Sequence, residues 1–100
     1  MQVRDRFYIN GGWVAPQGPD SLPVHEAGTG AVMGCVPAGT PGDVDAAVAA
    51  ARAAFDGWSR TPAPVRGEHL GKIAAGLKVR ADELARTMTQ EVGKIGRAHV

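Results

Sequence analysis

The 100-residue sequence is poor in cysteine, in long apolar runs and in excess charge. Its single cysteine, Cys35, cannot form an internal disulfide. No stretch reaches the roughly 18 apolar residues that a transmembrane helix needs, and residues 1–6 lack the apolar core of a signal peptide. Eleven basic and ten acidic residues give a net charge of +1, with no basic stripe for nucleic acid. These absences predict a cytoplasmic protein that binds neither membranes nor nucleic acid.

Large side chains for a hydrophobic core are also scarce. Aromatic residues make up only 5% of the chain, and much of its 44% hydrophobic content is alanine, which buries little apolar surface. A chain of this length buries a smaller share of its surface than a large domain does. We therefore expect a marginal core, or one that further sequence completes.

The first forty residues have the pattern of short strands joined by turns. Asn10-Gly11 is a strong hairpin signal, because both residues tolerate positive φ, and it separates the β-forming segments 7–9 and 12–14. Further along, the pattern predicts a loop over 15–21, a strand over 22–25, a turn at Thr29-Gly30 and a strand over 31–36. Because Pro23 cannot donate to a sheet ladder, we expect its strand at a sheet edge, or Pro23 at a strand start.

From residue 40 the pattern becomes helical. Thr40 is the expected N-cap, Pro41 the first helical residue, and Asp43 lies near the positive end of the helix dipole. Gly57 is expected to end or loosen this helix. Helical spacing predicts one apolar stripe, composed of Val44, Ala47, Val48, Ala51 and Phe55.

Thr61-Pro62 repeats the same start signal before a second helical stretch. A further cap near residues 80–82 leaves open one long helix or two, and Gly93 is the predicted stop. Glycines at 67, 71 and 76 each weaken a helix by roughly 1 kcal/mol relative to alanine, so the stretch needs tertiary partners. The apolar positions of this stretch are Leu70, Ile73, Ala74, Leu77, Ala81, Leu84, Ala85 and Met88.

Five segments, in family order from residue 7 to residue 94, resemble the N-terminal part of the NAD(P)-dependent aldehyde dehydrogenase superfamily. They are Phe7-Tyr8-Ile9-Asn10-Gly11-Gly12-Trp13-Val14, similar to the family's Y-I-N-G-x-W-V; Thr29-Gly30-Ala31-Val32; the helix Asp43–Phe55 followed by Trp58; the positions Arg66, Leu70, Ile73, Ala74 and Leu77; and Glu91-Val92-Gly93-Lys94, similar to E-x-G-K.

The sequence departs from this family pattern in two places. Glu26-Ala27 stands where the family has N-P before the Thr-Gly turn. After Lys94 the family continues with proline and a helix-forming stretch, whereas this chain reads Ile95 to Val100. We predict that residues 1–94 are the truncated N-terminal part of an aldehyde dehydrogenase domain, and that residues 95–100 are a non-native tail.

The resemblance implies an α/β fold, in which short N-terminal strands with a hairpin precede two or three α-helices of a Rossmann-like cofactor-binding domain. It also implies a homo-oligomeric parent enzyme that oxidises an aldehyde to a carboxylic acid with NAD or NADP. In such enzymes a cysteine thiolate attacks the carbonyl, hydride passes to the cofactor, and a general base activates water. The family's nucleophile and cofactor contacts lie in later sequence. We therefore expect no catalytic, cofactor-binding or metal-binding residue in this fragment, and neither a cofactor nor activity for the fragment alone.

The residues that could carry chemistry have simpler structural interpretations. Cys35 lies on a predicted strand without the cationic neighbour or helix N-terminus that activates a thiol, so a structural role is favoured over a nucleophilic one. His25, His69 and His99 lack the spacing of a metal site.

Glycines, carboxylates and aromatics are interpreted in the same way. Gly28-Thr29-Gly30 precedes a strand, so it is no dinucleotide fingerprint, and residues 39–42 form a helix cap more readily than an anion site. Pairs such as Glu68–Lys72 and Asp82–Arg86 are typical of solvated helix faces. For Trp13, Phe55 and Trp58 a core or domain contact is favoured over a binding surface.

A second interpretation belongs to another class of function. The same amphipathic helices would suit a small non-enzymatic interaction module whose apolar faces bind a partner. A cooperative melt from a compact monomer would favour such a module, whereas an incomplete segment would expose its stripes and self-associate.

Overall fold

The computed structural model describes residues 2–93, in which five short strands precede three helices. This order confirms the predicted α/β arrangement and resolves the second helical stretch into two helices. The elements are β1 (Gln2–Val3), β2 (Phe7–Ile9), β3 (Gly12–Val14), β4 (Ser21–His25), β5 (Val32–Pro37), α1 (Pro41–Ser59), α2 (Ala63–Val79) and α3 (Ala81–Val92). The proposed tail, residues 95–100, lies outside the described residues, and the boundary at residue 94 stays a prediction.

β2 and β3 form the predicted antiparallel hairpin. Tyr8 pairs with Trp13 in its register. Asn10 and Gly11 make the turn with φ of 55° and 77°, the left-handed conformation that a tight two-residue hairpin requires at both positions.

The remaining strands form a three-stranded sheet in the order β1-β5-β4. β4 is antiparallel to β5 and lies at the sheet edge, which agrees with the restriction that Pro23 places on it. β1 was not expected from the sequence. It pairs in parallel with β5, with Gln2 opposite Gly34, and the Arg4 amide donates to the Cys35 carbonyl at 2.9 Å.

α1 begins where the sequence predicts. Thr40 is its N-cap and Pro41 its first residue, and the Asp43 amide donates to the Thr40 hydroxyl at 3.2 Å. Gly57 does not end the helix, because α1 continues to Ser59, whereas a loosening of the helix at Gly57 stays a prediction. An added Cβ at Gly57 would meet no atom within 4 Å, so glycine there reflects no packing requirement in the described residues.

The start of α2 differs from the prediction. Pro62, rather than Thr61, is its N-cap, and no side chain caps it. The Thr61 hydroxyl instead donates back to the Gly57 carbonyl at the end of α1, at 3.3 Å. α2 and α3 are separated at Arg80, and α3 ends at Gly93 in the left-handed conformation with φ of 75°, as predicted.

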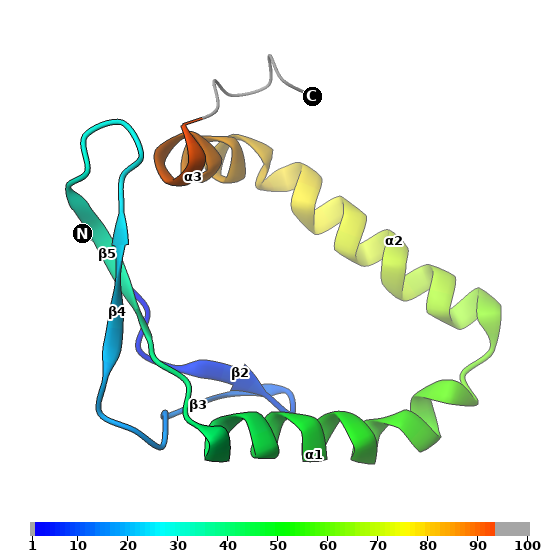
Figure 1. Cartoon of the computed structure of the whole chain (residues 1–100). Helices are drawn as coiled ribbons and strands as arrows, with labels where there is room; N and C mark the ends of the chain where they lie inside the picture. The colour runs from blue at the N-terminus through cyan, green and yellow to red at the C-terminus, as the bar shows by residue number, and fades with distance from the viewer. Residues whose placement is uncertain (1, 94–100) are drawn as a thin grey trace.

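The elements follow one another around an arc, from the sheet through the hairpin and α1 to α2, and α3 returns beside the β4–β5 turn (Figure 1). There the Ala27 amide donates to the Gln90 carbonyl at 2.7 Å. The radius of gyration is 17.1 Å, against about 13 Å for a compact domain of this length. Among the described residues no apolar side chain is buried, so the expected marginal core is absent from this part of the chain.

The accessible surface area also indicates that this chain lacks a buried core. The accessible surface is 7844 Å², whereas a compact monomer of 10.3 kDa has about 5,400 Å². The excess of about 2,500 Å² is surface that a compact fold of this size would bury. None of the helices in the described part of the chain has the length and hydropathy to cross a bilayer.

Candidate functional site

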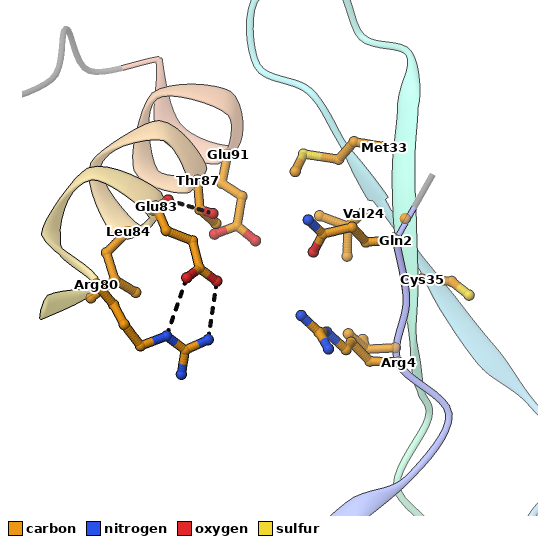
Figure 2. Close-up of a pocket in the computed structure, with 12 residues that line it drawn as sticks. Gln2, Arg4, Val24, Met33, Cys35, Arg80, Glu83, Leu84, Thr87 and Glu91 are labelled. Carbon is orange, nitrogen blue, oxygen red and sulfur yellow. Dashed lines mark hydrogen bonds and ion pairs between the residues drawn. The ribbon is translucent and has the colours of Figure 1, made fainter. Parts of the chain in front are cut away.

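A cleft of about 280 Å³ lies between α3 and the face of the sheet (Figure 2). β1 and its continuation supply Gln2 and Arg4, and β5 supplies Met33. The helix supplies Arg80, Glu83, Leu84, Thr87 and Glu91. Leu84 is the apolar residue of α3 that lines the cleft, and Figure 2 shows its side chain beside Arg80.

An ion pair at the start of α3 dominates the electrostatics of the cleft. The Arg80 guanidinium donates to both carboxylate oxygens of Glu83, at 3.2 and 3.0 Å. These hydrogen bonds, and then the positive charge itself, hold the pKa of Glu83 below its ordinary 4.5, and the charge of Arg4 across the cleft acts in the same direction. Because both side chains of the pair are more than half exposed, solvent screens the interaction and it contributes little to stability.

An irregularity in β5 decides which side chains face the cleft. Val24 pairs with Gly34 but His25 pairs with Val32, which leaves Met33 as an extra residue. Such a bulge re-aims side chains. Figure 2 shows Met33 reaching toward α3 while the Cys35 side chain points away from the helix. The thiol is half-buried on the far side, so the cleft does not combine it with any of the polar groups on α3.

His25 and His69 lie apart from the cleft and from each other. His25 Nδ1 is 3.1 Å from the Gly30 carbonyl oxygen. His69 is exposed on α2, with its ring centroid 5.6 Å from that of Trp58. In the described range 2–93, no three side chains of His, Cys, Asp or Glu gather as metal ligands. His99 lies outside that range.

The N-terminus of α1 holds a buried carboxylate with several hydrogen-bond donors around it. Asp43 is 6% exposed. Its carboxylate accepts from the backbone amides of Thr40 and Gln17, each at 2.9 Å, and from the Thr40 hydroxyl at 3.0 Å. These amides, Thr40 first and Gln17 second, hold the pKa of Asp43 below its ordinary 3.8.

The hydrogen bonds of the Asp43 carboxylate also bear on whether residues 39–42 could bind a phosphate. An anion at a helix N-terminus needs free amide donors. Here the chain's own carboxylate takes two of the nearby donors, and a side chain at Gly42 would collide with the Gln17 side chain, which lies against it. The arrangement fits a helix cap and does not fit a dinucleotide phosphate.

The predicted apolar stripe of α1 is only partly covered. The hairpin approaches this face, since Ile9 and Ala47 line the same two hollows, but Ala47 and Ala51 themselves remain exposed. The larger members Val44, Val48 and Phe55 each keep at least half of their surface exposed. On α2 the same holds for Leu70, Ile73 and Leu77.

The aromatic side chains do not form a core. Trp13 is 66% exposed and makes an edge-on contact with Tyr8, with the ring centroids 5.1 Å apart. The Trp58 ring lies next to the His69 ring, near the junction of α1 and α2. Phe55 is 65% exposed. A core role for these residues is therefore wrong within the described chain, and a contact with another domain stays a prediction.

Sequence reasoning missed two polar arrangements. The Arg80–Glu83 pair had a usable signal, because opposite charges three apart face each other on a helix. The hydrogen bond from Gln17 to Asp43 joins residues 26 positions apart, and no local sequence pattern predicts it.

Comparison with known proteins gives consistent matches. A model described as the aldehyde dehydrogenase family matches residues 13–99. The chain is 42% identical over 93 residues to a 3-succinoylsemialdehyde-pyridine dehydrogenase from a Pseudomonas species, covering 93% of this chain and 20% of that protein. It is 47% identical over 96 residues to aminoaldehyde dehydrogenase 2 of Zea mays, covering 91% and 19% respectively.

A solved structure extends this likeness to three dimensions. The chain matches the Mycobacterium tuberculosis aldehyde dehydrogenase complexed with NAD+ with a TM-score of 0.89 and 36% identity, over 95% of this chain and 20% of that one. The chain thus spans about a fifth of the length of the curated relatives it matches.

Proposed function

This chain belongs to the aldehyde dehydrogenase family, and we propose that it is the N-terminal segment of an enzyme that oxidises an aldehyde to a carboxylic acid with NAD+. The observation that carries the proposal is the family match over residues 13–99 together with the likeness to an NAD+-bound relative. The names of two similar relatives, each a dehydrogenase of an aldehyde, support the substrate class.

Within such an enzyme the segment acts as a frame rather than as the reacting centre. Its one thiol points away from the cleft (Figure 2), and its glycine-rich helix start is filled by Asp43. The groups that hold the cofactor and attack the aldehyde therefore belong to the other four-fifths of the enzyme. On this proposal the segment lies beside a Rossmann-like sheet in a cytoplasmic homo-oligomer, and NADP is the alternative cofactor.

The absence of a buried apolar core in residues 2–93 favours this proposal over a stand-alone interaction module. A free-standing module of this length needs apolar side chains removed from water to offset the conformational entropy of folding. Here the large apolar residues on α1 and α2 are exposed, as expected of a segment that another part of a protein covers.

A chimeric enzyme tests the proposal. Residues 1–94 would replace the matched first fifth of the Mycobacterium tuberculosis enzyme, and NADH formation with a panel of aldehydes would be measured. A second chimera that carries the matched segment of the Zea mays relative serves as control. We expect both to oxidise aldehydes with NAD+. An active control beside an insoluble or inactive test chimera would reject the proposed role.

A further inference from the structure

The turn of the β2–β3 hairpin holds the sole asparagine of the sequence, and a glycine follows it. Asn10 and Gly11 are both exposed, and an added Cβ at Gly11 would meet no atom within 4 Å. Since glycine carries no side chain of its own, the Gly11 backbone nitrogen is open to the Asn10 side chain and to water. A carboxamide next to an accessible backbone nitrogen is the arrangement in which asparagine closes on the chain that follows it.

The reaction needs only water and a base from the solvent. The Gly11 nitrogen forms a bond to Asn10 Cγ, its proton passes to the base, and the side-chain nitrogen leaves as ammonia, so that a cyclic imide forms. Water then breaks one of the two bonds from the ring nitrogen to a carbonyl carbon. When the bond to Cγ breaks, aspartate remains, and when the bond to the backbone carbonyl carbon breaks, isoaspartate remains. In isoaspartate the main chain runs through Cβ and Cγ, which lengthens it by one methylene group.

The reacting nitrogen lies outside the hydrogen bond that closes the turn. Ile9 pairs with Gly12 across the turn, and the closing bond of a β-turn uses the amide of its fourth residue, here Gly12, rather than that of Gly11. A second site of related chemistry, Asp56-Gly57, lies within α1, where each interior amide donates to the carbonyl four residues earlier. The helix therefore withholds the Gly57 nitrogen from the imide, whereas the turn does not withhold that of Gly11.

The hairpin is also easy to open. Its strands have three residues each and form a sheet of only two strands, an arrangement that is at best marginally stable. Its aromatic pair, Tyr8 and Trp13, remains 63% and 66% exposed, so little buried area opposes opening. Local opening of low free energy releases the fixed dihedral angles of the turn, and the Asn10 side chain can then reach the Gly11 nitrogen.

We propose that Asn10-Gly11 is a site of spontaneous deamidation and isomerisation whose rate is set by the opening of the β2–β3 hairpin. A tight two-residue turn requires a fixed length and positive φ at both positions. Isoaspartate adds a main-chain atom there, so the modified chain cannot rebuild the register that pairs Tyr8 with Trp13. Each event also places a negative charge beside the hollow that Asn10 and Gly11 line together with alanines of α1, and lowers the formal net charge of the chain from +1 to zero.

Mass spectrometry of the aged chain tests the proposal. The 100-residue chain and a synthetic peptide of residues 5–19 would be incubated in parallel in mildly alkaline buffer, and aliquots would be cut with a proteinase specific for the N-side of aspartate. Residues 5–19 stay whole when position 10 holds asparagine or isoaspartate, which differ in mass, and are split when it holds aspartate. We expect both products to accumulate at position 10 of the chain, more slowly than in the peptide, while cleavage before Asp56 stays complete.

Three variants assign the reaction and its control by the hairpin. Asn10→Gly keeps a Gly-Gly turn, which suits the same turn type, and should show no mass change in residues 5–19. Tyr8→Ala removes the edge-on contact with Trp13, whose ring centroid lies 5.1 Å away. It should accelerate the reaction about two- to fivefold, the factor that corresponds to a cross-strand aromatic pair. Val79→Ala, at a site 87% exposed on α2, is the matched control and should react at the wild-type rate.

Two results would overturn the proposal. If position 10 of the chain keeps its asparagine over a time in which the peptide is fully converted, the turn blocks the imide and the site does not exist. If Tyr8→Ala reacts at the wild-type rate, hairpin opening does not control the reaction. A Tyr8→Ala chain that has unfolded as a whole is recognised by the loss of its helix signal in circular dichroism. Gly12→Thr then provides the test, because a β-branched residue favours the strand and should slow the reaction; an unchanged rate there rejects the control by the hairpin.

Discussion

The two Thr-Pro sequences of this chain are predicted to respond differently to the same substitution. Thr40-Pro41 caps α1, whereas Thr61-Pro62 does not cap α2. Thr40→Ala removes an acceptor for the Asp43 amide at 3.2 Å and a donor to the Asp43 carboxylate at 3.0 Å. Thr61→Ala removes only a bond to the Gly57 carbonyl at the end of the preceding helix.

The size of the first effect follows from the cap. Replacing an N-cap threonine with alanine costs about 1 kcal/mol, which corresponds to about a fivefold change in the local opening equilibrium. The Thr40 and Gln17 amides keep their bonds to Asp43 at 2.9 Å, so the helix start is weakened rather than abolished. Thr40→Ser retains a hydroxyl and is expected to behave like the wild type.

Amide hydrogen exchange is the appropriate assay, because it reports local opening rather than global unfolding. In Thr40→Ala, exchange at Asp43 and Val44 should accelerate about fivefold. In Thr61→Ala, exchange at the first amides of α2 should stay unchanged. Unaltered protection at Asp43 in Thr40→Ala would refute the capping geometry. Equal losses of protection at the starts of α1 and α2 would instead show that any Thr-Pro sequence stabilises the helix start that follows it.

Other predictions concern pH and glycine. Because the pKa of Asp43 is held below 3.8 by the Thr40 and Gln17 amides, its contribution is complete above that pH and is lost as the pH falls below it. The protection of the amides at the α1 start, taken relative to the unfolded chain at each pH, should fall in the wild type as the pH is lowered from about 6 to about 2. In Asp43→Asn this protection should not change with pH. Gly93→Ala should destabilise α3 by about 1 kcal/mol, because φ is 75° there. Gly76→Ala has open space for its methyl group and should stabilise α2 by about 0.5–1 kcal/mol. The thermal melts of the two variants, followed by circular dichroism, should therefore shift in opposite directions from that of the wild type. Shifts of the same sign would contradict this pair of predictions.

Local elements were predictable because each rests on contacts between neighbouring residues. Asn10-Gly11 adopts the positive φ values of its hairpin, Thr40 caps the helix that follows it, and Gly93 terminates α3. In each case the decisive hydrogen bond or dihedral angle lies within a few residues, so composition and spacing carry enough information.

Predictions failed where a distant or competing partner decided the outcome. Thr61 has the same sequence signal as Thr40, but its hydroxyl bonds to the end of α1 instead. The strand at Gln2–Val3 exists because β5, thirty residues later, offers a parallel partner. A two-residue strand has no periodicity of its own to detect.

The candidate site was predictable in part. The cap interpretation of residues 39–42 is confirmed by the bonds of Asp43. The cleft between α3 and the sheet was not foreseen, because it depends on the return of α3 to the β4–β5 turn through the Ala27–Gln90 bond. The outward direction of Cys35 (Figure 2) likewise follows tertiary pairing, since an extra residue in β5 alters which side chains share a face.

By itself the sequence determined the kind and order of most elements, the turn of the hairpin, the cap of α1 and the stop of α3, and the resemblance to a family. Only the tertiary structure decided that the hairpin approaches the alanines of α1, while Phe55 and Leu70 stay exposed. Helical periodicity shows that a side of a helix is apolar, but not what lies against it. Covering that side requires a partner distant in sequence, and the described part of the chain brings to it only a small hairpin.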